Sequence, residues 1–150
     1  MKNRSLNSLY YAPILLLLFF GNGYFTAHVR AATYTVTSGA DSGRGTLRET
    51  VLISSSGDTI VFDPAVNLIV LTSGEIAIKK MLVIQGPGAN LLSITANASS
   101  RIFRISKGVK LTIADIELQK GVTTDFGGAI FNEGSLLLRR AFVKRSSARQ

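Results

Sequence analysis

Short apolar runs separated by turn-forming residues dominate the chain from position 32 onward. Within these runs apolar residues occupy alternate positions, as at Leu111/Ile113 and Leu136/Leu138, which is the period of a strand with one buried face. Because the turns are closely spaced, the strands are shorter than those of a typical sandwich. The pattern predicts an all-β protein whose chain turns a corner every few residues. The expected strands are Thr33–Thr37, Thr59–Phe62, Leu68–Leu71, Glu75–Ile78, Leu82–Ile84, Leu91–Thr95, Arg101–Ile105, Val109–Ile113, Ile116–Leu118, Ala129–Phe131, Leu136–Leu138 and Ala141–Val143.

One segment, residues 46–54, has the pattern of a short α-helix. It opens with a capping box, in which the Thr46 hydroxyl accepts from the Glu49 amide and the Glu49 carboxylate accepts from the Thr46 amide. Leu47 and Val51, four positions apart, share one face of this helix. A Ser-Ser-Ser-Gly run then ends in Gly57, where a left-handed C-cap is expected. A helix of this length is not stable alone, so we expect it to pack as a cap over the first strands.

A glycine precedes an alternating apolar pair three times, at Gly74, Gly108 and Gly134. The last two units superimpose at an offset of 25 residues. A period of about 20–30 residues built from strands and turns is typical of a β-solenoid, in which each coil buries its inward side chains on its neighbours. The longer first unit indicates an inserted loop, placed within Asn90–Ser100, and an irregular sandwich is the alternative fold. The superimposed residues are Ile105 on Ile130, Ile113 on Leu138, Ile116 on Ala141 and Leu118 on Val143.

The N-terminus has the pattern of a secretory signal peptide. A basic head is followed by the apolar run Tyr10–Phe20, which is shorter than the roughly 20 residues that a membrane-spanning helix needs. Small side chains suit signal peptidase at positions −3 and −1, so we predict cleavage after Ala31, with Ala32 as the second choice. The predicted organisation is therefore a signal peptide over 1–31 and a β-solenoid over 32–150. An uncleaved anchor or a buried N-terminal helix is the alternative.

Composition and charge narrow the possible functions. The chain has no Cys, which excludes disulfides and a cysteine nucleophile, and its one histidine, His28, would be removed with the signal peptide. The net charge of +8 comes from the two ends, because residues 32–138 carry nine basic and nine acidic side chains. A basic face for nucleic acid is therefore not expected, and the predicted location is secreted or on the cell surface.

The polar residues do not suggest an active site. Enzymes that cleave acidic polysaccharides need several carboxylates that converge on one face of the fold. In this chain only Asp115 and Glu117 are close in sequence and on one strand face. At the offset of 25, Asp115 falls beside Arg140, which predicts a surface ion pair between coils. We expect no catalytic residue, cofactor site or metal site.

Several other residues have structural interpretations. Gly127 and Gly128 would allow close approach of coils or supply positive φ. Asn132 could line a solenoid corner or lie in an exposed turn, and Asn97-Ala98-Ser99 is a glycosylation sequon. The aromatic residues are mostly expected in the core, with Phe142 pointing outward; they are Phe62, Phe103, Phe126, Phe131 and Phe142.

From Thr33 to about Ala148 the chain resembles the N-terminal part of bacterial right-handed parallel β-helix surface proteins. That group includes proteins classed as adhesins and is similar to the autotransporter-like passengers of the polymorphic outer-membrane proteins. In those proteins a Phe-x-x-Asn motif accompanies Gly-Gly-Ala-Ile, whereas this chain has Val143 and Ser146. The residues that carry the resemblance are Gly45–Glu49, Gly57–Phe62, Leu71–Ile76, Ile84–Ala89, Ser100–Phe103, Leu111–Ile113 and Gly127–Asn132.

The resemblance implies an exported cell-surface module that binds a carbohydrate or protein ligand and supplies no catalytic residues. The alternative is the N-terminal fragment of a pectate-lyase-like enzyme whose catalytic coils lie elsewhere. Family members are longer, so we expect a truncated chain with a basic end, residues 139–150, that forms the last coil. The predicted fold is a right-handed parallel β-helix with a short N-terminal capping helix.

Overall fold

A computed structural model describes residues 30–148 of the chain. The predicted signal peptide lies outside these residues except for Arg30 and Ala31, and so does His28. The predicted cleavage therefore stays a prediction. The elements are β1 (Thr33–Val36), α1 (Leu47–Ile53), β2 (Thr59–Phe62), β3 (Leu68–Val70), β4 (Ile76–Ile78), β5 (Leu82–Gln85), β6 (Ser93–Thr95), β7 (Phe103–Ile105), β8 (Lys110–Ala114), β9 (Glu117–Gln119), β10 (Val122–Thr123), β11 (Ile130–Asn132), β12 (Ser135–Arg139), β13 (Phe142–Lys144) and β14 (Ser147–Ala148).

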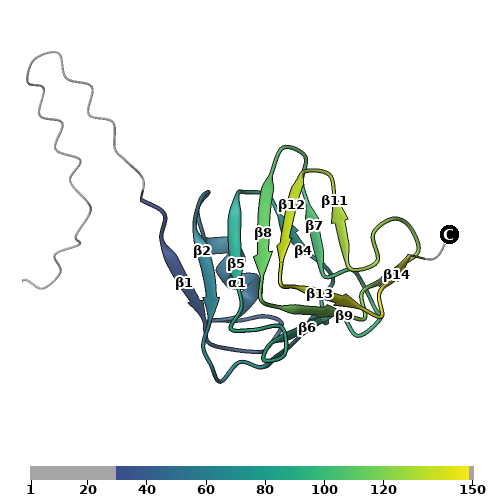
Figure 1. The fold of residues 1–150 in the computed structure, drawn as a ribbon, viewed down its shortest axis with the longest axis horizontal. Coiled ribbons are helices and arrows are strands. Elements are labelled where there is room, and N and C mark those ends of the chain that lie inside the picture. Colours follow the sequence, from purple (N-terminus) through teal and green to yellow (C-terminus); the bar gives the residue numbers. More distant parts are fainter. Residues whose placement is uncertain (1–29, 149–150) are drawn as a thin grey trace, which may run out of the picture.

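The strands pair only in parallel across the described residues, and each sheet takes one strand from each successive coil. The sheet orders are β1-β2-β5-β8-β12, β3-β6-β9-β13, β4-β7-β11 and β10-β14. The coils advance from the N-terminal strand at the left of Figure 1 to the C-terminal strands at the right. This arrangement is a β-solenoid, as the repeat predicted, and it rules out the irregular sandwich.

Aliphatic side chains of successive coils stack in register to form the core. Along the longest sheet, Ile60 pairs with Ile84, Ile84 with Ile113, and Ile113 with Leu138. The first three of these are fully buried, whereas Leu138 in the last described coil is 39% exposed. The predicted stacking of Ile113 on Leu138 is therefore confirmed, and the stacked side chains of the last described coil are less covered than those of the coils before it.

The offset of 25 holds between the last two strands of three of the four sheets and fails in the β4-β7-β11 sheet. Leu118 pairs with Val143 as predicted. The prediction that Ile105 stacks on Ile130 is wrong, because Ile130 pairs with Phe103 and Ile105 pairs with Asn132. Ile130 lies 27 residues after Phe103, because the segment from β9 to β11 (120–129), which contains β10, is longer than the segment from β6 to β7 (96–102). The offset returns to 25 at β12 because the turn from β11 to β12 (133–134) is shorter than the turn from β7 to β8 (106–109).

The proposed insertion within Asn90–Ser100 is also wrong as a single loop, since β6 lies inside it. Ile94 of β6 is fully buried and stacks on Ile69 of the preceding coil. Compared with the next coil, this coil is longer in the turn after β5, where residues 86–92 separate β5 from β6, whereas only residues 115 and 116 separate β8 from β9.

Helix α1 caps the N-terminal end of the core, as predicted, with Leu47 and Val51 buried among the first strands. The Thr46 hydroxyl accepts from the Glu49 amide, but the Glu49 carboxylate accepts from the amide of Gly45 at 2.6 Å, one residue earlier than expected. The expected Gly57 cap is wrong as well: the helix ends at Ser54 in extended conformation.

Gly127 and Gly128 serve the two roles expected of them. Gly127 has a φ of +71°, and a Cβ on Gly128 would collide with the backbone of Ser147 in the next coil. Glycine at position 128 therefore permits the close approach of the loop before β11 to β14.

Two expectations about the aromatic residues are wrong. Phe103 and Phe62 are buried, but Phe126 is 64% exposed and Phe131 lies on the outer surface of its sheet.

The strands β10 and β14 were not expected, because two-residue strands have no readable alternation. Phe142 points outward as expected, and the basic end forms strands of the last described coil.

Candidate functional site

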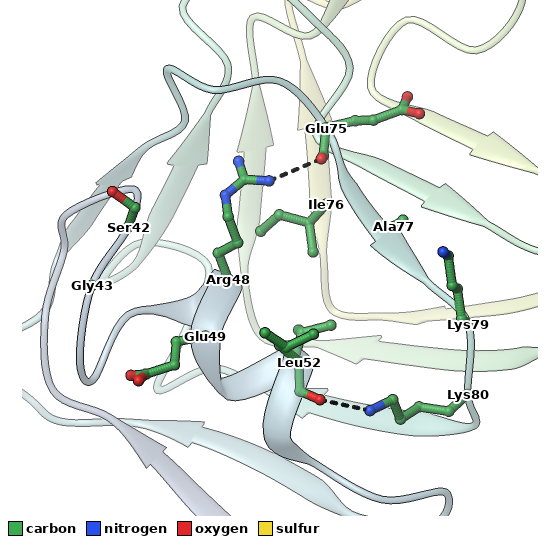
Figure 2. A pocket seen from close by; sticks show the side chains of 11 residues that line it. Ser42, Gly43, Arg48, Glu49, Leu52, Glu75, Ile76, Ala77, Lys79 and Lys80 are labelled. Atoms are coloured by element: carbon green, nitrogen blue, oxygen red, sulfur yellow. Dashed lines mark hydrogen bonds between the residues drawn. The ribbon is translucent and has the colours of Figure 1, made fainter.

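A cavity of about 560 Å³ separates α1 from the edge strand β4 (Figure 2). Apolar side chains line its centre and charged side chains its two ends. We call this cavity the α1–β4 groove. Its lining residues are Ser42, Gly43, Arg48, Glu49, Val51, Leu52, Glu75, Ile76, Ala77, Lys79 and Lys80.

Arg48 closes one end of the groove by joining α1 to the start of β4. Its guanidinium donates to the carbonyl oxygen of Gly74 at 2.7 Å and to that of Glu75 at 3.0 Å. It also forms an ion pair with Asp41 at 2.7 Å. Figure 2 shows Arg48 reaching from the helix to the Glu75 backbone. The guanidinium therefore supplies donors to an edge strand that has no neighbouring strand there.

Lys80 closes the other end. Its ammonium donates to the carbonyl oxygen of Leu52 at 3.0 Å and to that of Ser54. These are carbonyls at the C-terminal end of α1, where a positive charge also interacts favourably with the helix dipole. Between the two links the Leu52 side chain on α1 is 76% exposed, and Lys79 on the β4 side of the groove is also exposed.

Asp41 supports the Arg48 end. Partial burial would raise the pKa of its carboxyl group, but hydrogen bonds from Ser73 and Arg48 outweigh burial and hold that pKa well below its usual range. The carboxylate accepts from the Ser73 amide at 2.8 Å and also from the Thr72 hydroxyl. It is therefore an ionised structural group that links the loop before α1 to the turn before β4.

The groove opens onto the outer face of the β4-β7-β11 sheet. There Ala77 pairs with Arg104, and Arg104 with Phe131, so one residue of each coil forms a row. The guanidinium groups of Arg101 and Arg104 lie 5.2 and 5.4 Å from the centre of the Phe131 ring, within cation–π range. We call this row, with Arg101, the Phe131 face.

Carboxylates neutralise both arginines of the Phe131 face. Glu75 accepts from Arg101 at 2.8 Å and Asp125 accepts from its other terminal nitrogen, while Glu133 pairs with Arg104 at 3.3 Å. The hydrogen bond that Arg101 donates to Glu75 is the main cause that raises the pKa of Arg101. The face therefore combines an aromatic ring with fixed hydrogen-bonding groups and little net charge.

The predicted ion pair between coils is confirmed. Two guanidinium nitrogens of Arg140, Nε and Nη2, each donate to one oxygen of the Asp115 carboxylate at 2.6 Å. The side-chain amide of Gln85 in the preceding coil donates to the same carboxylate, also at 2.6 Å. The hydrogen bonds from Arg140 lower the pKa of Asp115. Glu117, which shares its strand face in the sequence, pairs with Lys144 instead. These two carboxylates therefore form separate ion pairs, Asp115 with Arg140 and Glu117 with Lys144, and do not converge on one site.

The remaining singled-out residues lie apart from the groove. Asn132 is exposed, and its side-chain oxygen accepts from the Gly134 amide, so it occupies an exposed turn. Asn97 is exposed in a turn with a φ of +49°. Within residues 30–148 no three acidic or histidine side chains lie close enough together to hold a metal ion.

Sequence reasoning missed both the groove and the Phe131 face. The available signals were the adjacent Lys79 and Lys80 directly after a predicted strand and the two arginines that flank Phe103. Neither signal indicated which strand forms the edge of its sheet.

Comparisons with known proteins add no relative: no protein-family profile, curated protein or solved structure matches the chain significantly. In the described part of the chain, helix α1 is too short to cross a membrane, and no longer apolar helix is present.

Proposed function

We propose that the protein is an exported cell-surface or secreted β-solenoid module of adhesin type, which binds its ligand through the Phe131 face and has no catalytic role. The observation that supports this proposal is the row formed by Ala77, Arg104 and Phe131 on the outer face of three successive coils. A sheet face of this kind is rigid and regular, so it presents its side chains at fixed spacing. An aromatic ring beside fixed guanidinium donors suits the apolar face and hydroxyl groups of a sugar ring.

Asp115 and Asp125 are not suited to act as general acids. General acid catalysis at neutral pH needs a carboxyl group whose pKa is raised. Hydrogen bonds from Arg140 and from Thr123 instead lower the pKa values of Asp115 and Asp125, respectively. The alternative function is a polysaccharide-active enzyme whose catalytic coils lie elsewhere, and an activity assay tests it directly.

A glycan array tests the binding role. The purified protein should bind a defined subset of glycans, and the double variant Phe131→Ala/Arg104→Ala should lose about tenfold in affinity for them. Thr112→Ala changes an outward residue on a different sheet and should leave binding unchanged. Equal binding by the wild type and the double variant would contradict the assignment of this face.

Export and the lack of activity need separate tests. Residues 1–40 fused to a leaderless alkaline phosphatase should give activity outside the bacterial cytoplasm, and the secreted full chain should begin at Ala32 by mass spectrometry. The same protein should release no products from pectin or alginate. Retention of residues 1–31 would refute the cleavage prediction, and turnover of either polymer would refute the non-enzymatic role.

A further inference from the structure

Strand β4 has an open edge that faces helix α1. Within residues 30–148 only β7 pairs with β4. The Ile76 amide donates to the Ile102 carbonyl at 2.9 Å, and the Ile78 carbonyl accepts from the Ser106 amide at 3.0 Å. In a parallel ladder both backbone groups of a residue point to one side, and the side alternates along the strand. Ala77 therefore directs its N–H and C=O away from β7 and into the α1–β4 groove.

The Arg48 side chain already satisfies one backbone carbonyl at the open edge of β4. The carbonyl of Glu75 has the same alternation as that of Ala77, and it accepts from the Arg48 guanidinium in the groove. At that residue a side chain takes the place of a neighbouring strand. The described residues offer no such partner to Ala77, because the second link, from Lys80, reaches only the end of α1. The centre of the edge is thus unoccupied between two fixed links.

The distance between a helix and a strand explains why the groove remains. Neighbouring strands lie about 4.8 Å apart, whereas a helix with side chains is about 10 Å in diameter and has no free backbone groups along its middle. Helix α1 therefore covers the core end without pairing with β4. The cavity of about 560 Å³ beside a three-residue strand has the position that a preceding strand would take.

The lining of the groove specifies the side chains of an occupant. Leu52, which is 76% exposed, provides most of the apolar wall, because Val51 and Ile76 line the groove with only 4% and 2% of their surface exposed. This wall suits a β-branched side chain on an extended segment. Lys79 is exposed at the end of β4 and forms no ion pair within the described residues, and the ammonium of Lys80 lies close by. Charge complementarity therefore favours acidic residues at one end of that segment.

From these observations we propose that the α1–β4 groove binds an extended peptide segment of a partner protein by β-augmentation. The segment adds a short strand to β4, pairs with both backbone groups of Ala77, packs a β-branched side chain on Leu52 and places acidic residues beside Lys79. The main-chain bonds supply affinity, and the apolar wall and the lysine supply specificity. This inference uses the backbone of Ala77, whose side chain belongs to the Phe131 face, and it depends neither on glycan binding nor on export.

Three labelled octapeptides test the proposal by fluorescence anisotropy with the purified protein. The peptide DETVTVDE should bind saturably, because its acidic ends meet Lys79 in either strand direction. The peptide KKTVTVKK should bind about tenfold more weakly, and so should DETPTPDE, whose prolines lack backbone donors. Amide exchange measured by NMR should slow at Ala77 when DETVTVDE is bound.

Two matched variants of α1 place the binding site. Leu52→Trp fills the groove and should weaken DETVTVDE binding about tenfold, whereas Ile53→Trp, at a neighbouring residue that is 57% exposed and does not line the groove, should not. Lys79→Glu should reverse the preference toward KKTVTVKK. Circular dichroism checks that each variant is folded.

The proposal is overturned if no peptide binds saturably, if both charge types bind equally, or if Leu52→Trp binds as the wild type does. A protein that fails these peptide tests but still binds glycans through the Phe131 face would refute this inference alone. A protein that binds DETVTVDE as predicted but no glycan would refute the proposed face alone.

Discussion

A single carboxylate, Asp41, joins the loop before α1 to the turn before β4. Its side chain is only 8% exposed and accepts from Arg48, Thr72 and Ser73. Because Arg48 also supports the edge of β4, loss of Asp41 would affect both the cap and the groove. Asp41 therefore contributes both to the stability of the fold and to the geometry of the α1–β4 groove.

Asp41→Asn should lower the free energy of unfolding by about 1–3 kcal/mol at pH 7, because partly buried donors lose an ionised acceptor. Urea unfolding measures this change. The matched control is Asp63→Asn, whose carboxylate accepts from the Ala65 amide in an exposed turn, and it should stay within about 0.5 kcal/mol of wild type. Equal effects of the two variants would contradict a special role for Asp41.

Acid should destabilise the protein through carboxylates of this kind. Hydrogen bonds lower the pKa of Asp58, chiefly from the backbone amides of Ala32 and Ser55, and that of Asp41 is also lowered. The unfolded chain takes up protons near the ordinary pKa of about 3.9, whereas the folded chain resists protonation to lower pH. The free energy of unfolding should therefore be constant above about pH 5 and fall progressively as the pH drops below that. A series of urea titrations from pH 7 to pH 2 should show this fall, with a smaller slope in Asp41→Asn.

Gly86 marks a close contact between coils. It is buried, and a Cβ there would collide with the carbonyl oxygen of Asp115 and the side chain of Ile116. Gly86→Ala should cost about 3 kcal/mol of unfolding free energy, since rigid backbone must shift. Gly108→Ala is the comparison, because Gly108 has a φ of +77° but open space, and it should cost only about 1 kcal/mol. Equal costs would show that the contact is easily relieved.

Helix α1 depends on its N-cap and on packing, because seven residues do not sustain a helix alone. The Thr46 hydroxyl both accepts from the Glu49 amide and donates to the Gly43 carbonyl, and the residue is 1% exposed. The cap therefore fixes the angle at which the helix meets the first coil.

Thr46→Ala should lower the free energy of unfolding by about 1–2 kcal/mol, whereas Thr46→Ser retains the hydroxyl and should recover most of it. Chemical denaturation of the two variants measures the difference. Equal losses would indicate that the methyl group matters more than the cap.

The whole molecule is a stack in which each coil contacts its neighbours, so the cost of a deletion should depend on how completely the site is covered. Ile84 is fully buried between coils, and Ile84→Ala should cost about 3–4 kcal/mol. Leu138 is 39% exposed, and Leu138→Ala should cost about 1–2 kcal/mol by the same measurement. A larger cost at Leu138 would mean that its surface is covered in solution.

Much of the fold could be predicted from the sequence because its signals are local. Period-two alternation gave the twelve longer strands, and the short turn between β8 and β9 repeats between β12 and β13, so the offset of 25 correctly paired Leu118 with Val143. The Asp115–Arg140 ion pair followed from the same register. The wider turns have no such signal, since variable loops add residues without changing the pattern of the strands, and there the Ile105–Ile130 pairing failed.

The sequence by itself thus determined the class of fold, the short capping helix and the aliphatic rows, because alternation and capping act between residues a few positions apart. Only the tertiary structure decided that Phe131 lies outside, that β4 is an edge strand and that a groove separates it from α1. These features depend on which segments become neighbours after the chain has wound through a full coil. A helix beside a strand leaves backbone groups of that strand unpaired, and this geometry exists only once both elements are in place.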